Sequence, residues 1–192
     1  MPHGHSWLDY QDYRERVKEF SDVIALFLNP VHLSTSGRQP ERAWIEAVSG
    51  NYFSMLGVKP ALGRFFQAGE GERPGADPYL VLAHHYWQRK FGGDPDMVGK
   101  TVVLNGQPFT VIGITPPEFN SAQWAIAPGA FVPATMLGQV LTGGDNLLKG
   151  RGAPAFKVMA RLKPGVTLAQ ARAAVGIVAK QLAADYPRTI KR

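Results

Sequence analysis

The sequence predicts an α+β protein made of short strands and helices, and three observations lead to this class. Glycine and proline are frequent, with 21 and 15 of the 192 residues, which indicates many turns rather than a helix bundle. Two β-prone segments within residues 100–114 flank Asn105-Gly106, the dipeptide that favours a type I′ hairpin. Residues 168–182 instead carry apolar side chains at helical spacing, behind a capping Thr167.

The N-terminal part predicts a helix over residues 10–27, because apolar residues recur there at spacings of three and four. These residues are Tyr10, Tyr13, Val17, Phe20, Ile24 and Phe27. Asn29-Pro30 is expected to end this helix, since the residue before a proline disfavours helical geometry. No strand pattern precedes this helix or follows Pro187, so the flanking strands of this part are expected to be truncated.

The remaining segments predict shorter elements. Expected are a strand at 42–48, a short helix at 52–56, an exposed loop at 67–78, a strand at 79–82, a helix at 83–91 and a strand at 155–162. Residues 120–154 are expected to be irregular, apart from a short apolar segment at 130–133, and the Gly-rich residues 141–152 to be mobile. The helix after Thr167 is expected to bury Leu168, Ala171, Val175, Val178 and Leu182.

The composition excludes several classes of site. The absence of cysteine excludes disulfides and thiolate metal sites, and no run of 18 apolar residues is present to span a membrane. The net charge of +6 is scattered, without a block of five or six like charges. We therefore expect no nucleic-acid partner. A basic nucleic-acid-binding module stays an alternative, and it would have its Lys and Arg side chains together on one face.

We find no sequence motif for catalysis. A Gly-x-Ser-x-Gly elbow and a P-loop are both absent. His84-His85 could serve a hydrolase-like enzyme only if a Ser or carboxylate met them in space, and Glu70 lies in a predicted loop without an apolar pocket. We expect no catalytic, cofactor-binding or metal-binding residues. Trp124, in the irregular segment, is the aromatic residue that we expect to face a partner, with core burial as its alternative.

Four segments resemble the MacB-like periplasmic core domain of ABC-type permeases, a group that includes FtsX-like and duplicated orphan permeases. Residues 48–64 read VSGNYFSMLGVKPALGR, and the family segment reads VSGNYFxxLGVxPxxGR. Residues 86–99, the hairpin at 104–117 and residues 161–167 are similar to three further family segments, in the same order. The resemblance covers about residues 6–187.

The resemblance implies two lobes: a β-α-β-type, porter-like lobe of residues 1–51 and 154–192, and an inserted β-rich lobe of residues 52–153 that contains the Asn-Gly hairpin. It also implies a non-catalytic domain on the periplasmic, extracytoplasmic side of the inner membrane, which recognises a substrate or partner and transmits conformational change during transport or efflux. The partners implied are the transmembrane helices of the parent permease and, indirectly, a cytoplasmic ATPase subunit. A second permease half or a periplasmic protein is a further candidate partner.

Overall fold

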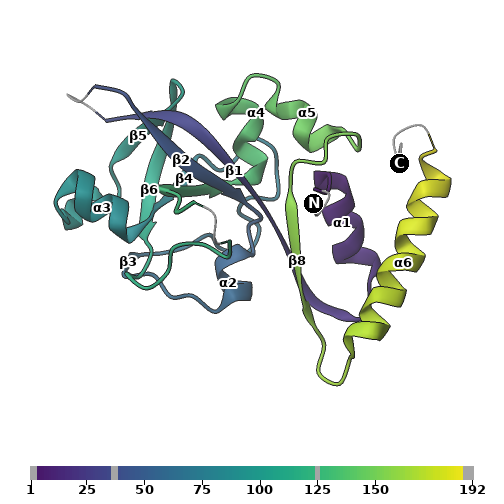
Figure 1. Ribbon diagram of the computed structural model, residues 1–192. Coiled ribbons are helices and arrows are strands. Elements are labelled where there is room, and N and C mark those ends of the chain that lie inside the picture. Colours follow the sequence, from purple (N-terminus) through teal and green to yellow (C-terminus); the bar gives the residue numbers. More distant parts are fainter. Residues whose placement is uncertain (1–3, 36–38, 124–125, 188–192) are drawn as a thin grey trace. The chain divides into compact units, whose positions relative to one another are not determined.

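The computed structural model describes residues 4–35, 39–123 and 126–187, and their contacts group the chain into two compact units (Figure 1). Unit 1 comprises residues 1–25 and 145–192, and unit 2 comprises residues 26–144. The lobe boundaries predicted from the sequence, at 51/52 and 153/154, stay a prediction.

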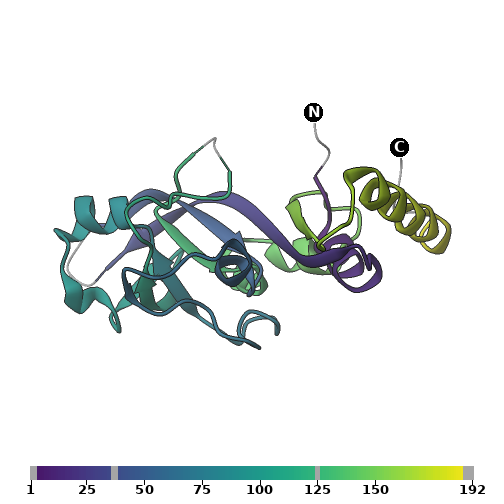
Figure 2. The ribbon, with the colours of Figure 1, turned by 90° about the horizontal axis from the view of Figure 1, so that it is seen from below.

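Unit 1 contains two long helices and a strand pair. Its elements are α1 (Trp7–Arg16), the first residues of β1 (Phe20–Ser34), most of α5 (Gly144–Lys149), β8 (Lys157–Leu162) and α6 (Leu168–Asp185). β8 pairs with β1, and a single bridge joins His5 to Phe156 ahead of α1. Figures 1 and 2 show α1 beside α6, where Val17 packs against Val178 and Leu182 in a small core.

The predicted helix over residues 10–27 is wrong in its second half. The helix α1 ends at Arg16, Val17 is extended with φ −84° and ψ 100°, and β1 then continues to Ser34. Residues 26–33 of β1 pair with β2 (Glu41–Val48) over eight positions, and β1 also pairs with β8. These pairings outweigh the helical spacing of the apolar residues. Pro30 lies within β1 opposite Trp44. On the other side of β1, β5 pairs only with Leu33 and Ser34 among the residues that the structure describes in unit 2, so Pro30 lies at an edge, which is where a strand tolerates proline.

The two long helices of unit 1, α1 and α6, each begin with a complete capping box. Thr167 Oγ1 accepts a hydrogen bond from the backbone N–H of Gln170 at 3.2 Å, and Gln170 Oε1 accepts one from the backbone N–H of Thr167 at 2.8 Å. This capping box fixes the start of α6 where the sequence predicts it. Ala171 and Val178 are buried as expected, but Leu168 is 58% exposed, because it lies in the first turn, beyond the core.

Unit 2 is built around strands whose pairings close into a ring. Its elements are the rest of β1, β2, α2 (Tyr52–Leu56), β3 (Leu62–Gly63), β4 (Tyr79–Leu82), α3 (His84–Phe91), the 3-10 helix η1 (Pro95–Met97), β5 (Thr101–Leu104), β6 (Gln107–Ile114), β7 (Ala130–Pro133), the 3-10 helix η2 (Ala134–Met136) and α4 (Leu137–Val140). The order β2-β7-β4-β6-β5-β1 returns to β2, because β1 also pairs with β2, while β3 adds to β6. Two pairings, β2–β7 and β4–β6, are parallel, and the others in the ring are antiparallel.

The core of unit 2 explains why strands with continuous apolar runs form here. Ile45, Leu80, Leu82 and Phe131 are fully buried, as expected for strands that are covered on both faces. Aromatic rings from α2 and the loops pack on this core, and Phe53 stacks on Phe65 with 3.9 Å between ring centroids. The mixed α+β class predicted from the sequence is confirmed.

The segment at 120–154 is more regular than predicted. The apolar residues 130–133 form β7 between β2 and β4, and η2 and α4 follow directly. The prediction that 141–152 is irregular throughout is wrong, because α5 occupies much of it. In the described parts of the chain, none of the helices combines the length and the apolar character that crossing a membrane requires.

The Asn-Gly hairpin has the predicted turn, with φ of 48° at Asn105 and 87° at Gly106. A Cβ atom at Gly106 would meet no atom within 4 Å, so Gly106→Ala tests backbone strain alone. We expect a loss of about 1–2 kcal/mol in the free energy of unfolding of unit 2, measured by urea denaturation. The control is Gly152→Ala in unit 1, where the added Cβ is also in open space and φ is ordinary. Its effect is measured on the unfolding of unit 1, and equal losses in the two variants, each in its own unit, would contradict the expectation.

Candidate functional site

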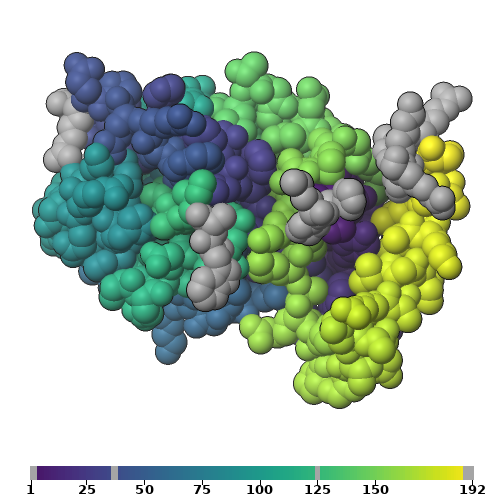
Figure 3. Space-filling model, in the orientation of Figure 1, coloured from purple at the N-terminus to yellow at the C-terminus, as the bar shows by residue number. Residues whose placement is uncertain are grey.

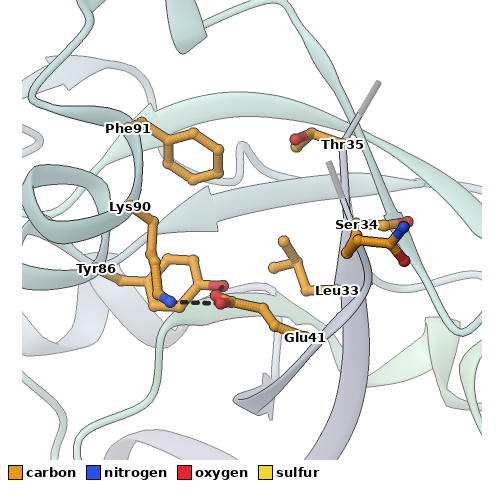
Figure 4. Close-up of a pocket in the computed structure, with 8 residues that line it drawn as sticks. Leu33, Ser34, Thr35, Glu41, Tyr86, Lys90 and Phe91 are labelled. Atoms are coloured by element: carbon orange, nitrogen blue, oxygen red, sulfur yellow. Dashed lines mark hydrogen bonds and ion pairs between the residues drawn. The ribbon is translucent and has the colours of Figure 1, made fainter. Parts of the chain in front are cut away.

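A pocket opens in unit 2 between α3 and the β1–β2 hairpin (Figure 4). The residues that line it are Leu33, Ser34, Thr35, Gln39, Glu41, Tyr86, Lys90 and Phe91. The pocket itself holds about 50 Å³, far below the roughly 300–1,000 Å³ of typical small-molecule sites. Its size therefore suits part of one side chain of a partner and not a drug-sized ligand.

The carboxylate of Glu41 lies at the centre of the polar wall. Tyr86 Oη donates a hydrogen bond to Glu41 Oε1 at 2.5 Å, and Lys90 Nζ forms an ion pair with Glu41 Oε2. Figure 4 shows all three side chains meeting on the same side of the pocket. The Glu41 and Lys90 side chains are each 35% exposed, so the ion pair remains in contact with solvent at the mouth.

Local sequence sets the position of α3 and therefore of this wall. Tyr86 and Lys90 are four residues apart and share one face of the helix. The backbone N–H of His84 donates to Thr115 Oγ1 at 3.0 Å, which ties the start of α3 to the end of β6. Gly92, with φ 65°, ends the helix directly after Phe91.

The electrostatics of the pocket favour binding over proton transfer. The hydrogen bond from Lys90, followed by that from Tyr86, holds the pKa of Glu41 below its ordinary value. Burial, followed by the hydrogen bond to Glu41, raises the pKa of Tyr86. Glu41 is therefore ionised and Tyr86 protonated near neutral pH. Neither group is poised for general acid–base work, which needs a pKa near the operating pH.

The two histidines that sequence reasoning singled out lie on α3, outside the pocket lining. The His84 ring contacts Trp87 edge to face at 5.4 Å between centroids. Burial, followed by the charge of Arg89, lowers the pKa of His85, and its buried Nδ1 has no hydrogen-bond partner in the part of the chain that the structure describes. Among these same residues, no three or more His, Asp or Glu side chains form a group that could hold a metal ion.

A second polar cluster in unit 2 surrounds Glu46, which is fully buried in β2. Its carboxylate accepts hydrogen bonds from Tyr52 Oη at 3.0 Å, Ser121 Oγ at 2.9 Å and Gln123 Nε2 at 2.5 Å. Tyr52 Oη in turn accepts the backbone N–H of Ala122 at 2.9 Å. The carboxylate therefore fixes residues 121–123 of the loop after β6 to the strand β2.

Sequence reasoning missed both glutamates of these clusters. A signal was present for Glu46, because one charged residue interrupts the apolar run Trp44-Ile45-Glu46-Ala47-Val48. No signal marked Glu41, since its partners on α3 are brought to it only by the folded sheet. The predicted partner contact, Trp124, lies outside the described residues.

The loop at 67–78 contains an ion pair with a consequence for pH. Arg64 donates two hydrogen bonds to Glu70, at 2.7 and 2.9 Å, and the Glu70 side chain is 18% exposed. The hydrogen bonds from Arg64 lower the pKa of Glu70 below its ordinary 4.5. Because the folded-state pKa is the lower one, this stabilisation is present above about pH 4.5 and is lost as the pH falls through the folded-state pKa.

We therefore expect Glu70→Gln to lower the free energy of unfolding of unit 2 by about 1 kcal/mol at pH 7. The difference from the parent protein should shrink below pH 4.5, where the parent also loses the charge. Urea denaturation at several pH values measures this, with the exposed Glu72→Gln as the control. A difference that stays constant down to pH 3 would contradict the assignment.

The mixed α+β fold is shared with extracytoplasmic domains of ABC transporters. The periplasmic region of MacB from Actinobacillus actinomycetemcomitans aligns with a TM-score of 0.69 at 16% identity, covering 97% of this chain and 77% of that one. The extracellular domain of the noncanonic ABC-type transporter YknZ from Gram-positive bacteria aligns with a TM-score of 0.67 at 15% identity, covering 97% and 87%.

The family model of the MacB-like periplasmic core domain matches residues 2–177, and the chain belongs to that family. Two curated relatives are similar over about half of the chain. The macrolide export ATP-binding/permease protein MacB of Bordetella avium (strain 197N) is 30% identical over 103 residues. The probable syringafactin export ATP-binding/permease protein SyfD of Pseudomonas syringae pv. syringae (strain B728a) is 27% identical over 117 residues. The matches span 54% and 58% of this chain but 15% and 18% of those relatives.

Proposed function

We propose that this chain is the extracytoplasmic domain of an ABC-type permease in a cell inner membrane. Within the permease it recognises a substrate or partner and transmits conformational change, and it has no catalytic role of its own. The observation that carries the proposal is the family match over residues 2–177, supported by fold similarity over 97% of the chain. In this proposal the ATP that drives transport is hydrolysed by a cytoplasmic ATPase, which acts on this domain through the transmembrane helices of the permease.

Two features of the structure support a role in recognition and transmission. The strand β1 runs without a break from unit 1 into unit 2. One continuous strand therefore crosses the boundary between the units, which lies between residues 25 and 26. The pocket around Glu41 offers an ion pair for binding, and its pKa directions do not suit acid–base chemistry. We propose this pocket as a place of contact with a partner such as a second permease half or a periplasmic protein. Trp124, which the sequence alone suggests, stays a further candidate contact residue.

The test measures distances between the units in the complete gene product, reconstituted with its ATPase. Spin labels at Lys18→Cys in unit 1 and Glu72→Cys in unit 2 suit this purpose, because both positions are exposed and the 192 residues contain no cysteine. We expect the distance distribution to differ between nucleotide-free and ATP-bound states. A pair inside unit 2, Glu72→Cys with Glu118→Cys, should not change. An unchanged distance distribution for the first pair would contradict the proposed transmission of conformational change.

A further inference from the structure

The β1–β2 hairpin has an inner and an outer face, because successive side chains of a strand point to opposite sides. The inner face belongs to the core of unit 2, and its buried residues are Val31, Leu33, Ala43 and Ile45. The outer face keeps contact with solvent, and Figure 3 shows β1 and β2, in dark blue, at the molecular surface. We call this outer surface the hairpin face, and its residues are Leu28, Pro30, His32, Arg42 and Trp44.

The pairing register divides the hairpin face into an apolar and a cationic part. Pro30 lies directly opposite Trp44, and Leu28 lies two residues before Pro30 on the same side of β1. His32 lies directly opposite Arg42. The Arg42 guanidinium also lies 5.9 Å from the centroid of the Trp44 ring, so the two parts are continuous. Tryptophan and arginine are among the residue types that contribute most to binding at protein interfaces.

The cationic part of the hairpin face has no carboxylate of its own. None of the ion pairs between residues that the structure describes includes Arg42. Glu46, which shares this side of β2, is buried and accepts hydrogen bonds from Ser121 and Gln123. A guanidinium that lies over an aromatic ring still presents its N–H donors in its own plane, in a fork that matches a carboxylate. The hairpin face therefore offers a place for a carboxylate beside an apolar surface.

The backbone beneath the hairpin face is fixed on both strands. Asn105 Oδ1 accepts a hydrogen bond from the backbone N–H of His32 at 2.8 Å, and the N–H of Asn105 donates to the His32 carbonyl at 2.9 Å. On β2, the Trp44 carbonyl accepts a hydrogen bond from the N–H of Gly129 at 2.8 Å. These bonds add to the eight paired positions of β1 and β2. A partner therefore meets a preformed surface, which lowers the entropy cost of binding.

We propose that the hairpin face binds an acidic segment of a protein partner. A carboxylate of that segment pairs with Arg42, and a neighbouring apolar side chain packs on Trp44 and Pro30. Charge complementarity carries this choice, because the cation has no acidic partner among the described residues and lies directly beside apolar side chains. The pocket described above is a separate site, since Glu41 lies on the inner face of the hairpin. The surface deepens the partner recognition proposed above and rests on it.

Two other classes of anionic partner fit the hairpin face less well. Unit 2 contains 8 Lys and Arg and 8 Asp and Glu, so the formal surplus of +6 belongs to unit 1, which has 13 against 7. Anionic lipid is typically bound by clusters of about four to eight basic residues, and nucleic acid by a basic patch that follows the phosphates. The hairpin face carries a single arginine and a single histidine, which suits one carboxylate.

The experiment selects short random-sequence peptides, displayed on phage, against the immobilised 192-residue chain. We expect the selected peptides to share an Asp or Glu beside a leucine or an aromatic residue. A fluorescein-labelled synthetic copy of a selected peptide then gives the dissociation constant by fluorescence polarisation. Arg42→Gln and Trp44→Leu should each weaken binding by about tenfold or more, because each removes one half of the contact. Binding should also weaken as the salt concentration rises.

The matched control is Arg89→Gln, since Arg89 is likewise an exposed cation over an aromatic ring, 5.5 Å from the centroid of Tyr86. This variant should leave peptide binding unchanged, and circular dichroism checks the fold of all three variants. The proposal would be overturned by a selection without enriched peptides, by enriched peptides that lack carboxylates, or by equal losses in Arg42→Gln and Arg89→Gln.

Other occupants of the hairpin face give different results. Self-association that Arg42→Gln abolishes, measured by analytical ultracentrifugation, would replace the protein partner by a second copy of this chain. Co-sedimentation with phosphatidylglycerol vesicles that Arg42→Gln abolishes would replace it by a membrane surface. Each result would overturn the proposal but leave the place of the domain in a permease untouched, because the distances between the units test that separately.

Discussion

Replacing Arg151 with methionine is expected to destabilise unit 1 by about 3 kcal/mol, since it removes one of the two cations of the nearly buried Asp12. Asp12 then keeps only its ion pair with the more exposed Arg16, at 2.9 Å. Arg151 Nη2 lies 2.6 Å from Asp12 Oδ2, and Nη1 lies 3.2 Å from Asp9 Oδ1. The Arg151 side chain is only 12% exposed and that of Asp12 only 9%. The guanidinium also lies over the ring of Tyr186, 4.0 Å from its centroid. One side chain thus joins α1 to the residue that follows α6.

Hydrogen exchange measures this effect unit by unit, so that the two units need not unfold together. Amides of α1 and α6 should exchange roughly a hundredfold faster or more in Arg151→Met, while amides of unit 2 keep their rates. The exposed Arg14→Met, in the last turn of α1, is the matched control and should change little. Adding Asp12→Asn to Arg151→Met should restore part of the protection, because the buried charge is then gone. Equal protection in Arg151→Met and Arg14→Met would contradict the assignment.

Replacing Glu46 with alanine is expected to cost unit 2 a similar 3–5 kcal/mol. The change leaves Tyr52 Oη, Ser121 Oγ and Gln123 Nε2 without their shared acceptor and opens a cavity beside β2. Glu46→Gln keeps the shape and one acceptor oxygen but turns an N–H₂ group toward these donors, so its cost should be intermediate.

Urea denaturation followed together with hydrogen exchange tests this expectation. Amides of residues 121–123 should lose protection first, because the hydrogen bonds of the Glu46 cluster hold this segment to β2. The control is Glu118→Ala, which changes an exposed carboxylate of the same loop. If Glu46→Ala and Glu118→Ala had the same stability, the buried carboxylate would not anchor the loop.

Local signals in the sequence predicted the elements that local interactions determine. The hairpin at Asn105-Gly106 depends on positive φ at two neighbouring residues, and the start of α6 depends on a capping box that spans four residues. Both features are complete within a few residues, and the structure confirms both.

The predictions from the sequence are wrong where pairing with residues far along the chain determines the secondary structure. Phe20, Ile24 and Phe27 have helical spacing, yet they lie in β1, whose partners begin at Glu41 and extend to β5 and β8. The pocket could not be predicted for the same reason, because Glu41 and Lys90 are 49 residues apart. That the excess of basic over acidic residues lies in unit 1 could not be predicted either, because it requires knowing that residues 145–192 fold with residues 1–25.

The side of the membrane on which this domain lies is the most direct test of the account. Single cysteines at Lys18 and Glu72, in the complete gene product expressed in cells, can be labelled with a membrane-impermeant maleimide, with the unsubstituted protein as the control. We expect both positions to react in spheroplasts with an intact inner membrane. Reaction only after the membrane is opened would contradict it, because the domain would then face the cytoplasm.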